Sequence, residues 1–144
     1  MLLRADTRVD LIRGLPLFEL CSKRDLRRIA ALADEREVEA GTELIREGEP
    51  GTEFYVVVEG EVEVRRRGRR VARLGNGSFV GEIALLSRSP RTATVVAVTP
   101  LWVLAISGKD FVQLLDHLPD LWLKVARTLA DRVDADEAMD GAGR

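Results

Sequence analysis

The spacing of hydrophobic and polar residues changes twice along the chain. Near the N-terminus, apolar residues recur every three or four positions, which is the period of a helix with one buried face. A short helix is predicted over Thr7–Arg13, ended by Gly14 and Pro16. Ser22 and Asp25 resemble a capping box that begins a second helix. The apolar face of that helix consists of Leu26, Ile29, Ala30 and Ala33.

From Asp34 onward the pattern changes to short stretches of β-type residues that are separated by glycine turns. The predicted strands are Glu35–Val38, Thr42–Arg46, Glu53–Val58, Glu61–Arg66, Arg70–Leu74, Thr92–Val98 and Leu101–Ile106. Arg67-Gly68-Arg69 is predicted to form a hairpin tip. Strands that recur roughly every 8–12 residues with turns between them favour a barrel or jelly roll over βαβ units.

Helical spacing returns in the last third of the chain. Ser107 and Asp110 form a second capping-box pattern, and a further helix is entered at Pro119. Its apolar stripe consists of Leu118, Leu121, Trp122, Val125, Leu129 and Val133. We expect Trp122 to lie in the core. The segment 135–144 is acidic and rich in small residues, and it is predicted to be a flexible tail after a single domain over 1–134.

These elements predict an α+β fold: an eight-stranded antiparallel jelly-roll barrel with an N-terminal helical segment, a short helix within the strand series, and C-terminal helices. The 144 residues suffice for one core, and the hydrophobic fraction of 46% is that of an ordinary globular protein. The one cysteine, Cys21, excludes an internal disulfide and fits the reducing cytosol. No apolar run is long enough to cross a bilayer. We therefore expect a cytoplasmic protein with no membrane partner.

Charge and residue types exclude several classes of function. The net charge is −2, which provides no overall field for nucleic acid. The predicted hairpin carries five arginines, namely Arg65, Arg66, Arg67, Arg69 and Arg70. They are interpreted as a solvated surface and not as a nucleic-acid site, because glutamates precede them and no aromatic residue lies among them for base stacking. His117 is the only histidine, so no metal site of the cupin kind is expected. No nucleophile with a base is apparent, so we expect no enzyme activity.

The segment from Phe79 to Val95 interrupts the strand pattern and carries the chemistry. Gly81 lets the backbone approach a ligand closely, and Arg91 supplies a planar, permanently charged fork for two phosphate oxygens. Glu82 repels a phosphate but suits a neighbouring hydroxyl, from which it accepts a hydrogen bond. The three residues together indicate a ligand with an anionic group and a hydroxyl side by side, such as a ribose 3′,5′-cyclic phosphate.

The run G-E-I-A-L-L-x-x-x-P-R-T-A-T-V resembles the phosphate-binding cassette of cyclic-nucleotide-binding domains. These domains occur in the regulatory subunits of cAMP-dependent kinases, in the bacterial catabolite activator protein and in cyclic-nucleotide-gated channels. The resemblance extends from Leu11 to Val133 and includes Leu15-Pro16-Leu17-Phe18 and Phe54-Tyr55-Val56-Val57-Val58-Glu59-Gly60.

The resemblance implies a role for each residue of the cassette. Arg91 pairs with the cyclic phosphate, Glu82 accepts a hydrogen bond from the ribose 2′-hydroxyl, and Gly81 allows the close approach. The backbone amides of Ile83, Ala84 and Ala93 add donors. Thr92 occurs in cAMP and cGMP binders alike, so it leaves the base open. We expect cAMP to bind at least as well as cGMP, because no second base-selective polar residue accompanies Thr92, and we expect the Arg91 guanidinium to be buried only when ligand is present.

The implied function is reversible binding of a cyclic nucleotide as a signal. A hinge near Phe111 to Leu115 then moves the last helix, which acts on a protein effector or a second copy of the chain. The residue that covers the base is one of Trp122, Val125, Arg127, Leu129 and Arg132. Three alternatives remain: a degenerate interaction module without ligand, the N-terminal part of a DNA-binding transcription regulator, and a jelly-roll enzyme.

Overall fold

The computed structural model describes the backbone of residues 5–142 and the side chains of residues 7–132 other than 83 and 87. The helices are α1 (Ala5–Arg13), the 3₁₀ helix η1 (Pro16–Phe18), α2 (Lys23–Leu32), α3 (Glu82–Ser87), α4 (Gly108–His117) and α5 (Pro119–Ala142). The strands are β1 (Asp34–Val38), β2 (Glu43–Ile45), β3 (Glu53–Glu59), β4 (Val62–Arg66), β5 (Arg69–Leu74), β6 (Phe79–Val80), β7 (Thr94–Ala97) and β8 (Leu101–Ser107).

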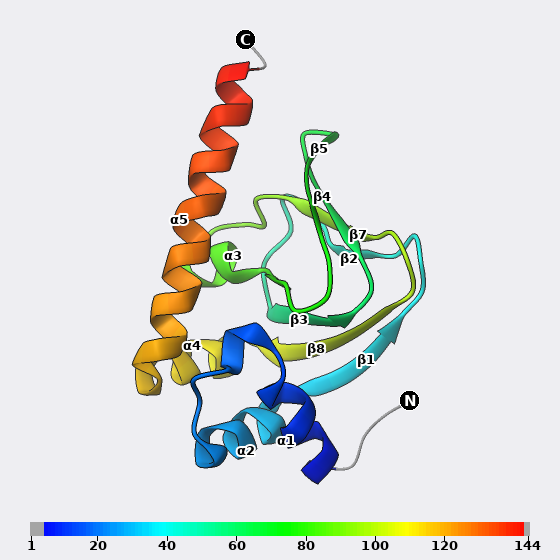
Figure 1. Cartoon of the computed structure of the whole chain (residues 1–144). Helices are drawn as coiled ribbons and strands as arrows, with labels where there is room; N and C mark the ends of the chain where they lie inside the picture. Colours follow the sequence, from blue (N-terminus) through cyan, green and yellow to red (C-terminus); the bar gives the residue numbers. More distant parts are fainter. Residues whose placement is uncertain (1–4, 143–144) are drawn as a thin grey trace.

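The eight strands form two antiparallel sheets that pack face to face. One sheet has the order β1-β8-β3-β6 and the other the order β2-β7-β4-β5. Buried residues of both sheets make up the core between them, among them Ile45, Tyr55, Val57, Val62, Val95 and Val103. The predicted α+β jelly roll is confirmed, with the helices gathered outside the strands (Figure 1).

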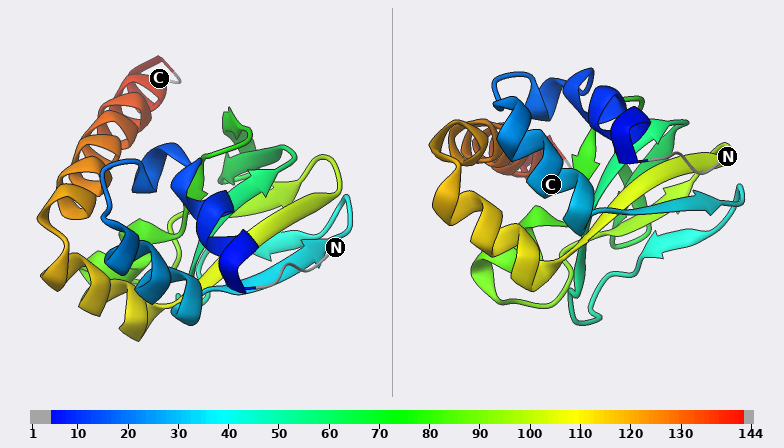
Figure 2. Two further views of the ribbon diagram at one scale, coloured as in Figure 1. Left: turned by 60° about the horizontal axis from the view of Figure 1, so that its bottom comes forward. Right: turned by 90° about the horizontal axis from the view of Figure 1, so that it is seen from below.

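The strands β3 and β8 are buried on both faces, which explains their unbroken apolar runs. On β3, Tyr55 and Val57 point into the core between the sheets, whereas Phe54 and Val56 belong to the core under the helices. The Phe54 ring stacks on Phe111 of α4, with 4.1 Å between the ring centroids. This second core joins α1, α2, α4 and α5 to the outer face of the sheet (Figure 2).

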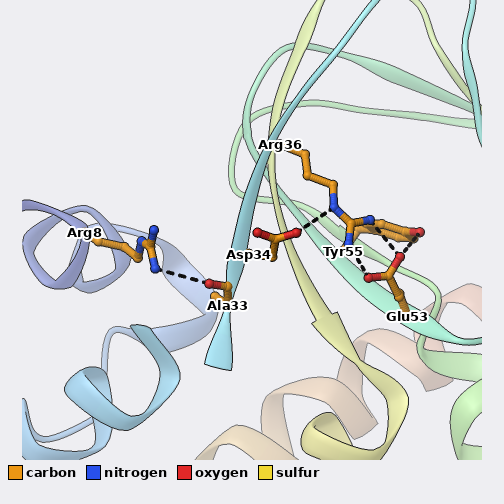
Figure 3. Close-up of polar contacts among 6 residues, drawn as sticks. All are labelled: Arg8, Ala33, Asp34, Arg36, Glu53 and Tyr55. Atoms are coloured by element: carbon orange, nitrogen blue, oxygen red, sulfur yellow. Dashed lines mark hydrogen bonds and ion pairs between the residues drawn. The ribbon is translucent and has the colours of Figure 1, made fainter. Parts of the chain in front are cut away.

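Both predicted helix caps are present. The Ser22 hydroxyl accepts a hydrogen bond from the Asp25 amide at 3.2 Å, and the Ser107 hydroxyl accepts one from the Asp110 amide at 3.1 Å. At the other end of α2, Arg8 donates to the Ala33 carbonyl at 3.3 Å (Figure 3). The side chain of α1 thereby satisfies a carbonyl that the helix leaves without an internal partner.

Three features differ from the sequence prediction. The two-residue strand β6 was not predicted, because it is too short to show alternation. Helix α5 continues as far as Ala142, through most of the segment predicted as a tail. Trp122 is 46% exposed, so its prediction as a core residue is wrong. The inward face of α5 is provided by Leu121 and Val125, which are 2% and 0% exposed.

Candidate functional site

A cavity of about 130 Å³ lies between the strands, α3 and α5. Six of the seven predicted site residues line it: Gly81, Glu82, Ala84, Arg91, Thr92 and Ala93. The seventh, Ile83, lies in α3, and its side chain is outside the described set. Residues 81–84 and 91–93 are separated in sequence by most of α3 and meet because the chain returns through Pro90 to β7.

The Arg91 guanidinium is held in place by two backbone carbonyls. It donates to the Gly81 oxygen at 2.8 Å and to the Glu53 oxygen at 2.5 Å. Arg91 is only 7% exposed, so the expectation that it is buried only with ligand is wrong. Burial lowers the pKa of the Arg91 guanidinium, while the negative charges of Glu82 and Glu53 act in the opposite direction. A guanidinium does not lose its proton in proteins, so Arg91 remains charged.

Two glycines make room for the Arg91 side chain, because neither has a Cβ. Gly81 has a φ of +97°, in the left-handed region, and a Cβ there would lie 2.8 Å from Nη1 of Arg91. A Cβ on Gly51 would lie 3.2 Å from Nε of Arg91 and 2.9 Å from the Ala84 Cβ. Any side chain at either position displaces the guanidinium, so both glycines are needed to fix it.

Glu82 is the most buried charged residue of the cavity, at 1% exposure. Its Oε1 accepts a hydrogen bond from Nη1 of Arg132, on α5. Its Oε2 is buried and has no hydrogen-bond partner among the described residues. Arg132 also donates to the Phe79 carbonyl at 2.5 Å and lies over the Phe79 ring, 5.0 Å from its centroid. Helix α5 is thereby joined to the cassette through a buried carboxylate.

A second cluster of polar side chains, formed by Arg36, Glu53 and Tyr55 (Figure 3), is joined to the site through the backbone of Glu53. The Glu53 carboxylate accepts two hydrogen bonds from the Arg36 guanidinium, at 2.7 and 2.6 Å, and one from the Tyr55 hydroxyl at 3.0 Å. The Arg36 hydrogen bonds hold the pKa of the Glu53 carboxyl below its ordinary value. Because the backbone oxygen of Glu53 binds Arg91, this cluster helps to position the cassette arginine.

This cluster predicts a pH dependence of folding stability. A depressed folded-state pKa contributes stability above the unfolded pKa, about 4.3, and that contribution is lost as the pH falls through the folded value. Glu53→Gln should therefore lower the free energy of unfolding by on the order of 1 kcal/mol at pH 7, since the pair is partly exposed. The difference from wild type should shrink below about pH 4 in urea unfolding curves.

Glu39→Gln is the matched control, because Glu39 is exposed and lies outside this cluster. It should leave the unfolding curve within about 0.5 kcal/mol of wild type. A Glu53→Gln deficit that stayed constant from pH 7 to pH 3 would contradict the electrostatic account.

Several cavity residues were not predicted as site residues. An apolar wall comes from β2, β4, β5, β6 and β7, and consists of Ile45, Val64, Val71, Ala72, Leu74, Val80 and Val95. Their alternation indicated strands but not a shared cavity. Arg66 also lines the cavity and is half-buried, so its assignment to a solvated surface is wrong. The expectation that cAMP binds at least as well as cGMP stays a prediction. The other four hairpin arginines are exposed.

Of the five residues predicted as candidates to cover the base, Arg132 is the one that lines the cavity. Among the residues whose side chains the structure describes, no group of three or more His, Cys, Asp or Glu residues is arranged to hold a metal ion. Within residues 5–142, no helix has both the length and the hydropathy required to cross a membrane.

Residues 35–117 match the family model of the cyclic nucleotide-binding domain. The chain therefore belongs to this family. It is 35% identical over 124 residues to a cAMP-dependent protein kinase regulatory subunit of Eremothecium gossypii, which covers 85% of this chain and 27% of that protein. It is 36% identical over 123 residues to a cyclic nucleotide-gated potassium channel of Mesorhizobium japonicum, which covers 85% of this chain and 34% of the channel. The chain thus spans about a third of these curated relatives.

The fold is also that of known structures. A cAMP-bound PfPKA-R structure superposes with a TM-score of 0.87 at 20% identity, over 94% of this chain and 47% of the other. An identity this low shows the fold alone. The family match and the fold together make this chain a regulatory domain of the cyclic nucleotide-binding kind.

Proposed function

We propose that the cavity binds the ribose and cyclic phosphate of a 3′,5′-cyclic nucleotide. The observation that carries the proposal is the buried Oε2 of Glu82, which has no hydrogen-bond partner among the described residues and lies in the same cavity as Arg91. A buried acceptor without a donor costs free energy, about 1–3 kcal/mol. A ribose 2′-hydroxyl supplies the missing donor, whereas an anionic group would be repelled.

Arg91 is the group that suits the cyclic phosphate. A guanidinium has five N–H donors, and two of its nitrogens already donate to carbonyls of Gly81 and Glu53. The remaining donors are held in a fixed plane by those two bonds. A planar and preorganised cation binds two phosphate oxygens with little further loss of side-chain entropy.

The charge balance explains how a carboxylate and a phosphate share one cavity. Arg132 forms an ion pair with Glu82, so the carboxylate does not present an uncompensated negative charge to the ligand. The same contact ties ligand binding to α5. A cavity of about 130 Å³ is small for a nucleotide, since ligand pockets usually measure about 300–1,000 Å³. We infer that ligand binding widens the cavity by moving α5, and that this movement of α5 is the signal.

We propose binding and signalling without catalysis, in the cytoplasm, with the free thiol Cys21 in keeping with that compartment. The output reaches a protein effector or a second copy of the chain through α5, since the large apolar residues Trp122 and Leu123 are 46% and 47% exposed there. The segment 135–144, predicted as a tail, comes after Arg132, the residue through which α5 contacts the cassette. Fraying of this segment stays a prediction.

Thermal unfolding with and without nucleotide tests the proposed function. A ligand at about 100 times its dissociation constant adds about 2.7 kcal/mol to the free energy of unfolding, which should raise the Tm by roughly 10 °C. A 3′,5′-cyclic nucleotide should produce this rise, and the matching nucleoside 5′-monophosphate should not. An unchanged Tm with every cyclic nucleotide would favour the ligand-free interaction module.

A further inference from the structure

The outer face of helix α2 carries a group of positive charges that no described acidic residue balances. The group, called the basic face of α2 below, consists of Lys23, Arg24, Arg27 and Arg28. All of these side chains are exposed, and none forms a hydrogen bond or an ion pair with a residue that the structure describes. The opposite face of α2 is buried in the core, so the helix is held by its apolar side and leaves its cations available for binding.

This arrangement of charges disfavours the helix that carries it. Lys23 lies four residues before Arg27, and Arg24 lies four residues before Arg28; like charges at this spacing repel each other on a helix. Two of the cations also lie in the first turn, at the positive end of the helix dipole, whereas the last turn has no basic residue. Local rules broken without a compensating contact inside the chain are expected at a functional surface.

The chain itself carries a segment of matching charge. Helix α5 continues to Ala142, and residues 133–142 include four acidic residues and no lysine or arginine. The four are Asp134, Asp136, Glu137 and Asp140. This end of α5 and helix α2 lie at opposite ends of the domain (Figures 1 and 2). The two segments therefore meet only when they belong to different copies of the chain.

We propose that the basic face of α2 binds the acidic end of α5 of a second copy of this chain. Three of the four cations are arginines, whose planar guanidinium groups bind carboxylates through paired hydrogen bonds and are common at protein interfaces. Leu20, which precedes α2 and is 64% exposed, adds an apolar contact beside the charges. This association requires no nucleotide, so it is independent of the proposed function.

Sedimentation velocity without nucleotide tests the proposal. Wild type should associate at about 50 mM salt, and the association should weaken roughly tenfold or more at about 500 mM, where the Debye length falls below about 5 Å. Replacing Arg24 and Arg27 together by glutamate should weaken association at least as much, because carboxylates then face carboxylates. The same replacement turns both four-residue like-charge pairs into opposite-charge pairs, so thermal unfolding should show a Tm at or above that of wild type.

A second variant, with Asp134→Lys and Glu137→Lys, provides a rescue experiment. It should not associate with itself, but an equal mixture with the α2 variant should associate, because opposite charges then meet again. Arg69→Glu with Lys109→Glu is the matched control, since both residues are exposed, lie outside α2 and α5, and give the same change of charge. The control should associate as wild type does.

Three results would overturn the proposal: a wild-type chain that stays monomeric at low salt up to about 100 μM, a mixture of the two variants that stays monomeric, and a control that loses association as the α2 variant does. A monomeric chain that still binds a cyclic nucleotide would overturn this inference alone and leave the proposed function in place.

Discussion

Replacing Arg91 by alanine should weaken cyclic-nucleotide binding by about 2–5 kcal/mol, the usual cost of truncating one partner of a buried charge pair. The same substitution should also lower the stability of the free protein. Arg91 joins the Gly81 and Glu53 carbonyls, and a buried acceptor left without a donor costs about 1–3 kcal/mol. Calorimetry measures the first effect, and urea unfolding without nucleotide measures the second.

Arg91→Lys separates the two effects. An ammonium can still donate to one carbonyl, so stability should be largely kept, but it cannot form the planar fork and should restore affinity only in part. Glu39→Gln serves again as the control, since Glu39 is exposed and does not line the cavity. An Arg91→Ala protein that bound cyclic nucleotide as tightly as wild type would remove Arg91 from the site.

Arg132→Ala is expected to have the second large effect. It leaves the Glu82 carboxylate, which is 1% exposed, without its cation. Breaking a buried ion pair by removing one partner costs about 3–5 kcal/mol, and the low end applies because the Arg132 side chain is 25% exposed. The unneutralised carboxylate should also repel the phosphate, so nucleotide affinity should fall with stability.

A double-mutant cycle with Glu82→Gln isolates the pair. If Arg132 acts through Glu82, the double variant should be more stable than the sum of the single effects allows, with a coupling of about 1–3 kcal/mol. Arg127→Ala is the control on the same helix, because Arg127 is exposed and should change the free energy of unfolding by no more than about 0.5 kcal/mol. Additive effects in the cycle would show that α5 is not linked to the cassette through this contact.

The parts of the fold that local rules govern were predictable from the sequence. The caps at Ser22 and Ser107 and the long strands β3 and β8 follow from side-chain chemistry and periodicity within a few residues. The cassette could be predicted too, since Gly81, Glu82 and Arg91 lie close in sequence and carry a specific chemical combination.

The remaining features depend on contacts between distant segments. Arg66 belongs to a run of arginines, and which of them faces the cavity is decided by the register of β4 on β7. The exposure of Trp122 follows from how α5 docks, since Leu121 and Val125 face the core instead. The burial of Arg91 depends on a carbonyl of β3, 38 residues away. The spacing of residues within one helix or strand does not reveal such contacts between distant segments.

The most direct test of the central claim is calorimetric titration of the wild-type chain with a 3′,5′-cyclic nucleotide and with its 2′-deoxy analogue. The account predicts one nucleotide bound per chain. It also predicts roughly tenfold or weaker binding of the analogue, because the buried Oε2 of Glu82 then loses its hydroxyl donor, at a cost of about 1.5–3 kcal/mol. Equal affinity for the two ligands, or no binding of either, would contradict it.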